Sequence, residues 1–97
     1  MPEAGGSEGR RWVVEGLVQG VGFRWFIHDR AMGLGVRGWV RNLEDGAVEV
    51  VGLASPDTMA EFDEIVRRGP PGAHVIQITT NDVPHEIVDT KSFIIKH

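Results

Sequence analysis

Residues 16–24 read GLVQGVGFR and join a β-patterned run to a helical one. Gly20 and Gly22 allow backbone conformations that turn successive N–H groups toward one point, and Arg24 adds a planar guanidinium beside them. The N-terminus of a helix attracts anions by itself. This pattern favours a phosphate-binding loop, with an ordinary glycine-rich turn and a surface arginine as the alternative, because short glycine motifs often occur without that function.

The segments on either side of the loop have different periodicities. Residues 11–18 are apolar and β-branched and predict a first strand. After the loop, apolar residues follow the i, i+3, i+4 spacing of a helix with one buried face. These are Phe23, Phe26, Ile27, Ala31 and Leu34. Gly35 provides a C-terminal stop for this helix.

A hairpin is predicted next. Residues 36–42 and 47–53 have strand patterns, and the link between them contains Asp45-Gly46, a pair typical of hairpin turns. The two strands should therefore be antiparallel neighbours.

A second helix is predicted to begin at Ser55-Pro56-Asp57, which combines a capping serine, a proline suited to the first helical position and an early acid. Its apolar stripe is Met59, Phe62, Ile65 and Val66. Proline and glycine in residues 69–72 end it. Residues 75–79 predict a fourth strand, and residues 92–96 a short fifth strand at a sheet edge.

The element order is βαββαβ plus a terminal strand. This order predicts an α+β fold of the ferredoxin-like type, an antiparallel sheet with two helices on one face and a short C-terminal strand. Residues 11–97 should form a single domain. Residues 1–10, rich in small and acidic residues, predict a disordered tail with no place in the fold.

Composition excludes several function classes. The formal net charge of the 97 residues is -4, which argues against a general nucleic-acid binder, because such affinity depends on neutralising many phosphates. Cysteine is absent, so there is no thiolate metal site and no cysteine nucleophile. No run has membrane-spanning length and the first residues lack a secretory pattern, so a cytoplasmic location and a monomer are expected.

Two segments resemble the signature segments of the acylphosphatase family. They are residues 16–24 and residues 38–42, GWVRN, and the likeness extends over residues 11–97. The resemblance implies a hydrolase that cleaves the carboxyl–phosphate bond of acyl phosphates to a carboxylate and inorganic phosphate, without a cofactor. Small-molecule acyl phosphates, such as carbamoyl phosphate or glycolytic acyl phosphates, are the substrates that it implies.

The same resemblance implies roles for individual residues. Arg24 binds the phosphate, Asn42 positions the attacking water, and backbone amides form the cradle. The cradle residues are Gly20, Val21, Gly22, Phe23 and Arg24. No metal ligand is implied.

The residue chemistry agrees with these roles. A guanidinium binds two phosphoryl oxygens at once, and a neutral amide such as that of Asn42 orients water but cannot act as a strong base. With no cysteine, direct attack by water is the simpler route. The roles require that the end of the first strand and the end of the second face one pocket, which holds only if the sheet order brings them close. We predict that it does.

Other polar and aromatic residues receive plainer interpretations. Gln19 is predicted to support the loop through its amide. Trp25 and Trp39 are predicted to be partly buried, with a place along the substrate's approach as the alternative. The histidines lack metal-ligand spacing and are predicted to be surface or structural residues; they are His28, His74, His85 and His97. Four acids are assigned to solvated faces: Glu15, Glu49, Glu61 and Asp63.

Two functional alternatives stay open. An RNA-binding module shares this architecture, but Val21 stands where an aromatic residue should stack a base, and the motif lies in a loop. A non-catalytic module that binds phosphate or another small anion would keep the loop without turnover; such a domain forms part of larger carbamoyl-transfer proteins. Residues 16–24 match neither a nucleotide P-loop nor the dinucleotide fingerprint.

Overall fold

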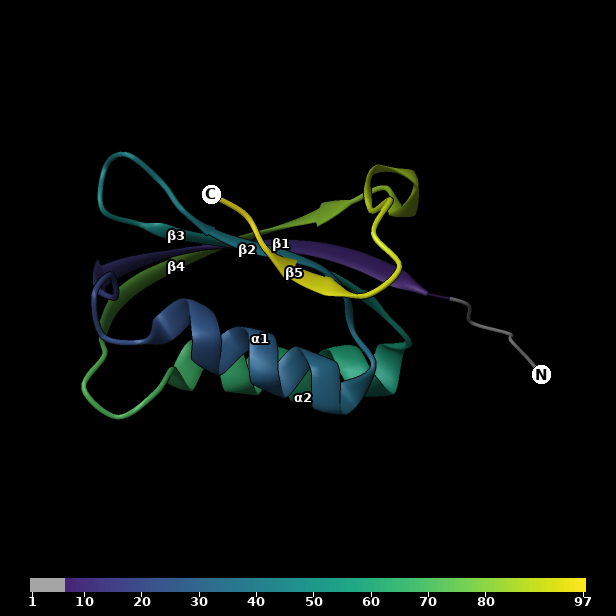
Figure 1. Cartoon of the computed structure of the whole chain (residues 1–97). Helices are drawn as coiled ribbons and strands as arrows, with labels where there is room; N and C mark the ends of the chain where they lie inside the picture. The colour runs from purple at the N-terminus through teal and green to yellow at the C-terminus, as the bar shows by residue number, and fades with distance from the viewer. Residues whose placement is uncertain (1–6) are drawn as a thin grey trace.

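The computed structural model describes residues 7–97. Its elements follow the predicted order, with one additional short helix near the end of the chain (Figure 1). They are β1 (Glu8–Leu17), α1 (Phe23–Leu34), β2 (Arg37–Asn42), β3 (Val48–Ala54), α2 (Pro56–Arg68), β4 (His74–Val83), the 3-10 helix η1 (His85–Ile87) and β5 (Phe93–Ile95).

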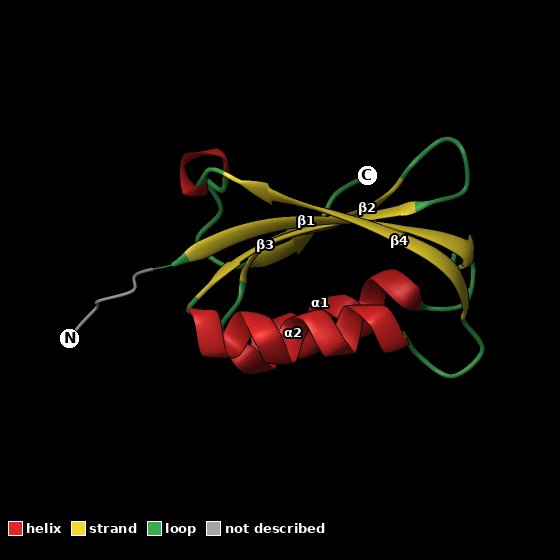
Figure 2. Ribbon diagram, turned by 180° about the vertical axis from the view of Figure 1, so that it is seen from behind, coloured by secondary structure: helices red, strands yellow, loops and turns green. Residues whose placement is uncertain are grey.

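The strands form one sheet in the order β4-β1-β3-β2-β5, and both helices pack against the same face of it (Figures 1 and 2). The pairs β1–β3, β1–β4 and β2–β3 are antiparallel. This is the predicted α+β ferredoxin-like arrangement. The sheet as a whole is mixed, because β5 runs parallel to β2 at the edge.

The predicted N-terminal boundary is wrong at its last residues. Residues 1–6 of the expected tail lie outside the described residues, but residues 8–10 already belong to β1. Glu8 pairs with β3, and Gly9 and Arg10 pair on both sides; Arg10 lies opposite Gly52 of β3 and Asp82 of β4. Because β4 extends to Val83 instead of ending at residue 79, it provides a pairing partner for these residues.

The helices begin and end where local chemistry directs. Gly22 precedes α1, and Gly35 ends it in a left-handed conformation, with its N–H directed at the carbonyls of Ala31 and Met32. Ser55 caps α2 by accepting a hydrogen bond from the N–H of Thr58. No helix within residues 7–97 has the length and apolar character needed to cross a membrane.

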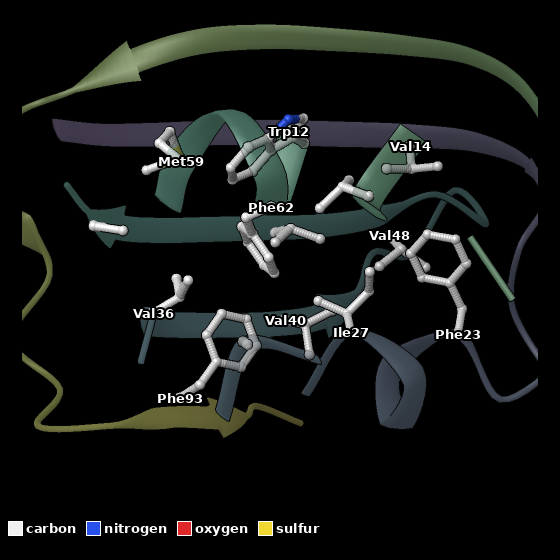
Figure 3. Packing of buried hydrophobic residues seen from close by; sticks show 14 of the residues in the cluster. Trp12, Val14, Phe23, Ile27, Val36, Val40, Val48, Met59, Phe62 and Phe93 are labelled. Carbon is white, nitrogen blue, oxygen red and sulfur yellow. The ribbon is translucent and has the colours of Figure 1, made fainter. Parts of the chain in front are cut away.

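A chain of aromatic contacts runs through the core between the sheet and the helices (Figure 3). The ring of Phe62 packs edge-on against Trp12 at 5.4 Å and against Phe93 at 5.9 Å between centroids. Trp12 is fully buried, and its indole N–H donates to Oδ1 of Asp63 at 2.8 Å. The assignment of Asp63 to a solvated face is therefore wrong, because a buried indole N–H needs an acceptor.

Gly38 in β2 lies so close to β3 that an alanine in its place would clash with the neighbouring strand. Its φ is +145°, and a Cβ atom there would overlap the carbonyl oxygen of Val51 on β3. The close approach of β2 to β3 and to Ser92, whose carbonyl accepts from the Gly38 N–H at 3.1 Å, depends on this missing side chain.

We predict that Gly38→Ala lowers the free energy of unfolding by about 3 kcal/mol, because it adds backbone strain and a steric overlap. Urea denaturation followed by circular dichroism measures this loss. Gly33→Ala in α1 is the matched control, since nothing lies within 4 Å of its added Cβ, and we expect a gain of about 0.5–1 kcal/mol. Equal stability of the Gly38 variant and the wild type would contradict the interpretation.

Candidate active site

The loop from β1 to α1 is built around two left-handed glycines. Gly20 and Gly22 have φ values of +77° and +78°, and an added Cβ on either would meet nothing within 4 Å. Glycine is favoured there for its backbone conformation and not for lack of space. A turn that contains left-handed residues can direct successive backbone N–H groups into one concavity.

The N-terminus of α1 is left without a capping side chain. Gly22 precedes the helix with no side-chain hydrogen bond, and the first turn contains no acidic residue. The first amides of a helix have no partner inside it, and the helix dipole makes that end positive. The end of α1 is therefore prepared for an anion from outside the helix.

A cavity of about 110 Å³ lies at this helix end, and the two predicted catalytic side chains both line it. Its lining consists of Val18, Gly20, Gly22, Phe23, Arg24, Trp25 and Asn42. Arg24 is half-buried, and within residues 7–97 its guanidinium makes no ion pair. The site therefore holds a positive charge that no carboxylate of the described chain neutralises.

Two of the predicted cradle residues pack their side chains against the core. The side chain of Phe23 is buried in the core, and that of Val21 packs against the core from its edge. These contacts hold the loop against the core. Val21 does not line the cavity, so the structure separates it from the other predicted cradle residues.

Gln19 ties the loop to the β2–β3 hairpin. Its side-chain Nε2 donates to the backbone carbonyls of Leu43 and Ala47, at 2.9 Å each. The N–H of Leu43 donates to the carbonyl of Ala47 at 2.8 Å, which closes the hairpin immediately after Asn42. The predicted support by Gln19 is present, and it joins the loop to the segment that carries Asn42.

The sheet order explains how these distant segments meet. β1 and β2 flank β3 on either side, and both run antiparallel to it. β1 and β2 therefore point the same way, and their C-terminal ends lie at the same end of the sheet. The register of β1 against β4 shifts between Glu15 and Gly16, a bulge just before the loop. Bulges bend a strand and redirect the chain that follows. The predicted meeting of the two strand ends is confirmed.

Trp25 is placed differently from the prediction. Its side chain is 64% exposed, not partly buried, and it lines the cavity with Arg24. The ring stands edge-on to His28, with centroids 5.8 Å apart.

Trp39 is half-buried as predicted, with its indole N–H directed at Oε1 of Glu49 at 3.1 Å. Within residues 7–97, no three acidic or histidine side chains come together as metal ligands would.

Glu49 is the polar residue that the sequence interpretation missed. It was assigned to a solvated face, yet it is only 4% exposed and lies on the sheet face opposite the helices. Its Oε2 lies 2.7 Å from Nε of Arg11 on β1, and its Oε1 lies 2.7 Å from Nε of Arg41 on β2. One carboxylate thus joins β1, β2 and β3.

These hydrogen bonds set the charge state of Glu49. Burial alone would raise the pKa of the Glu49 carboxyl, but hydrogen bonds from Arg41, Arg11 and Trp39 outweigh burial and hold this pKa below its ordinary value. The signal that predicts this arrangement is an acid at an alternating strand position with arginines on both neighbouring strands. Recognising it requires the strand register.

Comparison with known proteins identifies one family. The family model described as Acylphosphatase matches residues 10–95. The acylphosphatase of Pasteurella multocida (strain Pm70) is 42% identical over 84 residues, which cover 87% of this chain and 89% of that protein. The acylphosphatase of Synechococcus sp. (strain CC9902) is 45% identical over 74 residues, which cover 76% of this chain and 63% of the relative's length.

A solved structure agrees with these sequence relatives. The crystal structure of an acylphosphatase from Bacillus subtilis matches this fold with a TM-score of 0.86 at 32% identity. The match covers 93% of this chain and 99% of that chain. The similarity therefore includes the two helices and the sheet together.

We predict that Glu49→Gln lowers the free energy of unfolding at pH 7 by about 2 kcal/mol. This magnitude lies between those for surface and buried ion pairs, because Arg11 and Arg41 are partly exposed. The folded pKa is lowered, so this stabilisation is complete above the ordinary pKa of about 4.5 and is lost as the pH falls through the folded pKa.

The measurement is urea denaturation of wild type and variant between pH 3 and pH 7. Their difference should shrink at the acidic end, while Asp63 titrates equally in both proteins. Glu61→Gln, an exposed acid on α2, is the matched control and should change stability little at any pH. A difference that does not depend on pH would contradict the assignment.

Proposed function

The chain belongs to the acylphosphatase family, and we propose that it hydrolyses the carboxyl–phosphate bond of small acyl phosphates at the cavity beside Gly20 and Gly22. The observation that carries the proposal is the convergence of three groups on this cavity. They are the N–H groups at the start of α1, which Gly22 leaves without a side-chain cap, the Arg24 guanidinium, which forms no ion pair within residues 7–97, and the Asn42 amide. The first two bind an anion, and the third orients water.

Binding is assigned to the backbone and to Arg24. The amides of residues 20–24 hold phosphoryl oxygens, and the guanidinium holds two oxygens in a bidentate geometry. These donors are fixed by the fold before substrate arrives, so they stabilise the charge of the transition state at little reorganisation cost. Catalysis of phosphoryl transfer consists mainly of such positioning and electrostatic stabilisation.

Asn42 is assigned to the attacking water. The amide oxygen accepts a hydrogen bond from the water, whose oxygen attacks phosphorus in line with the leaving group. The P–O bond to the acyl group breaks as the new P–O bond forms, and the water proton passes to a phosphate oxygen. The leaving carboxylate is a weak base and needs no general acid. Orientation alone can contribute up to about 7–11 kcal/mol.

The cytoplasmic location and the monomeric state stay predictions from composition. A small anion-binding module is the second candidate, because the donors of the cavity would bind phosphate even without turnover. The two candidates differ in what Asn42 does, since binding alone requires no positioned water.

We predict that the wild-type protein hydrolyses benzoyl phosphate in excess chelator, because the donors of the cavity are amides and a guanidinium, which do not ligate cations. Arg24→Ala should lower kcat/KM by about 1,000-fold or more and weaken competitive inhibition by inorganic phosphate at least tenfold, since the main charged donor is lost. Spectrophotometric hydrolysis assays measure both quantities.

Arg68→Ala removes an exposed arginine at the end of α2 and is the matched control, expected to stay within about twofold of wild type. Arg24→Lys keeps the charge but not the planar fork, so it should restore only part of the lost activity. Near-normal phosphate inhibition in Arg24→Ala would contradict the assigned role. A folded wild type that binds phosphate without turnover would favour the anion-binding module.

We predict that Asn42→Ala lowers kcat about 100- to 1,000-fold and leaves the phosphate inhibition constant within about threefold, because the amide acts on water and not on the phosphoryl group. Steady-state kinetics with phosphate as inhibitor separate the two effects. Asn81→Ala, an exposed asparagine on β4, is the control and should behave as wild type. Loss of phosphate inhibition in Asn42→Ala would overturn this division of labour.

A further inference from the structure

A second and larger cavity adjoins the phosphate cradle. Its volume is about 370 Å³, and Arg24 and Trp25 line both cavities. Its other walls come from His28 on α1 and from Phe93 and Ile95 on β5. A cavity of this size is at the lower end of the range for small-molecule sites, which are mostly apolar with a few polar groups.

We propose that this larger cavity is an acyl-group subsite that selects acyl phosphates with aromatic or bulky apolar acyl groups over acetyl phosphate. The inference rests on the proposed function, since it assigns a place to the part of the substrate that the cradle does not hold. Residues 16–24 and 38–42, which carry the family resemblance, include Arg24 but none of the other walls.

In-line attack determines the direction in which the acyl group leaves the cradle. The attacking water and the leaving oxygen stand on opposite sides of phosphorus. Asn42 lines the small cavity and not the large one, whereas Arg24 and Trp25 stand between the two. With water held at Asn42, the space on the other side of Arg24 is the larger cavity, and the acyl group extends into it.

The chemistry of the walls selects the acyl group. Trp25 presents a large aromatic side chain that is 64% exposed, so an acyl ring packed against it would bury surface that the chain itself leaves uncovered. Ile95 is half-buried opposite α1 and packs against the core cluster. An acetyl group is too small to reach both walls.

The aromatic wall is held in place by the core. Trp25 contacts His28, and His28 lies 6.4 Å from Phe93 between ring centroids. Phe93 is buried and packs against Phe62. Most of the subsite is therefore built on α1 and β5, and this support keeps its shape before substrate binds.

The carboxylate of the leaving group also fits this position. Arg24 borders both cavities, so the guanidinium stays near the carboxylate oxygen as negative charge develops on it. Among the described residues that line the larger cavity there is no aspartate or glutamate. The departing carboxylate therefore meets a cation and no acidic side chain of the described residues.

The test compares kcat/KM for benzoyl phosphate and acetyl phosphate in wild type, Trp25→Ala and Ile95→Ala. Each acyl phosphate has its own intrinsic reactivity. Comparing the ratio of the two kcat/KM values between wild type and variant cancels this difference in reactivity. We expect each substitution to lower this ratio, about tenfold for Trp25→Ala, which corresponds to about 1.4 kcal/mol. For Ile95→Ala, which lines the larger cavity and not the cradle, acetyl phosphate turnover and inhibition by inorganic phosphate should change by less than about threefold.

A readout without turnover uses phenylphosphonate and methylphosphonate as competitive inhibitors. Wild type should bind phenylphosphonate more tightly, and Trp25→Ala should lose the difference. Met32→Ala removes another exposed apolar side chain from α1 away from both cavities, and it should keep the wild-type ratio. Circular dichroism melting of each variant confirms that the proteins compared are folded.

The outcomes separate the two proposals. An unchanged substrate ratio in folded Trp25→Ala and Ile95→Ala, with acetyl phosphate still hydrolysed, overturns the subsite and leaves the proposed function standing. An equal loss for both substrates also overturns it, since Trp25 would then support the cradle. A wild type that hydrolyses neither acyl phosphate contradicts the proposed function itself.

Discussion

The two hydrogen bonds from the Gln19 amide to the hairpin are the constraint on which the site depends. They join the loop after β1 to the turn after β2, across the strand that separates β1 from β2. Without them, the loop before Arg24 and the hairpin turn after Asn42 would be joined only through the sheet. Effective orientation of reacting groups requires near-ångström precision. The Gln19 amide binds two carbonyls at once and so fixes the position of the loop relative to the hairpin.

On the proposed function, a protein with a net charge of -4 holds an anion because the donors of the cradle are mostly backbone groups. Arg11 and Arg41 are ion-paired with Glu49, whereas Arg24 forms no ion pair within residues 7–97. The Glu49 carboxylate offsets part of the charge of these two arginines and joins three strands. Arg11 and Arg41 thus stabilise the sheet, while Arg24 is left available for an anion.

How well the sequence predicts a residue's role depends on how far away along the chain its partners lie. Gly20, Gly22 and Gly35 act through local backbone conformation, so their roles were readable along the chain. Glu49 was not, because its partners come from two other strands. Trp25 was misplaced although a signal existed, since it follows the buried Phe23 by two helical positions, about 200° around the helix. The parallel pairing of β5 depended on where η1 returned the chain, which no local pattern encodes.

The arrangement divides recognition between backbone and side chains. On the proposed function, the cradle binds what all acyl phosphates share, through amides whose positions depend on glycine conformation and on the anchoring of Phe23 in the core. The adjoining cavity is lined mainly by side chains from α1 and β5, so substitutions there alter its shape without moving the amides. On the subsite proposal, selectivity among acyl groups varies independently of phosphate binding, because Arg24 and Trp25 alone are common to both cavities.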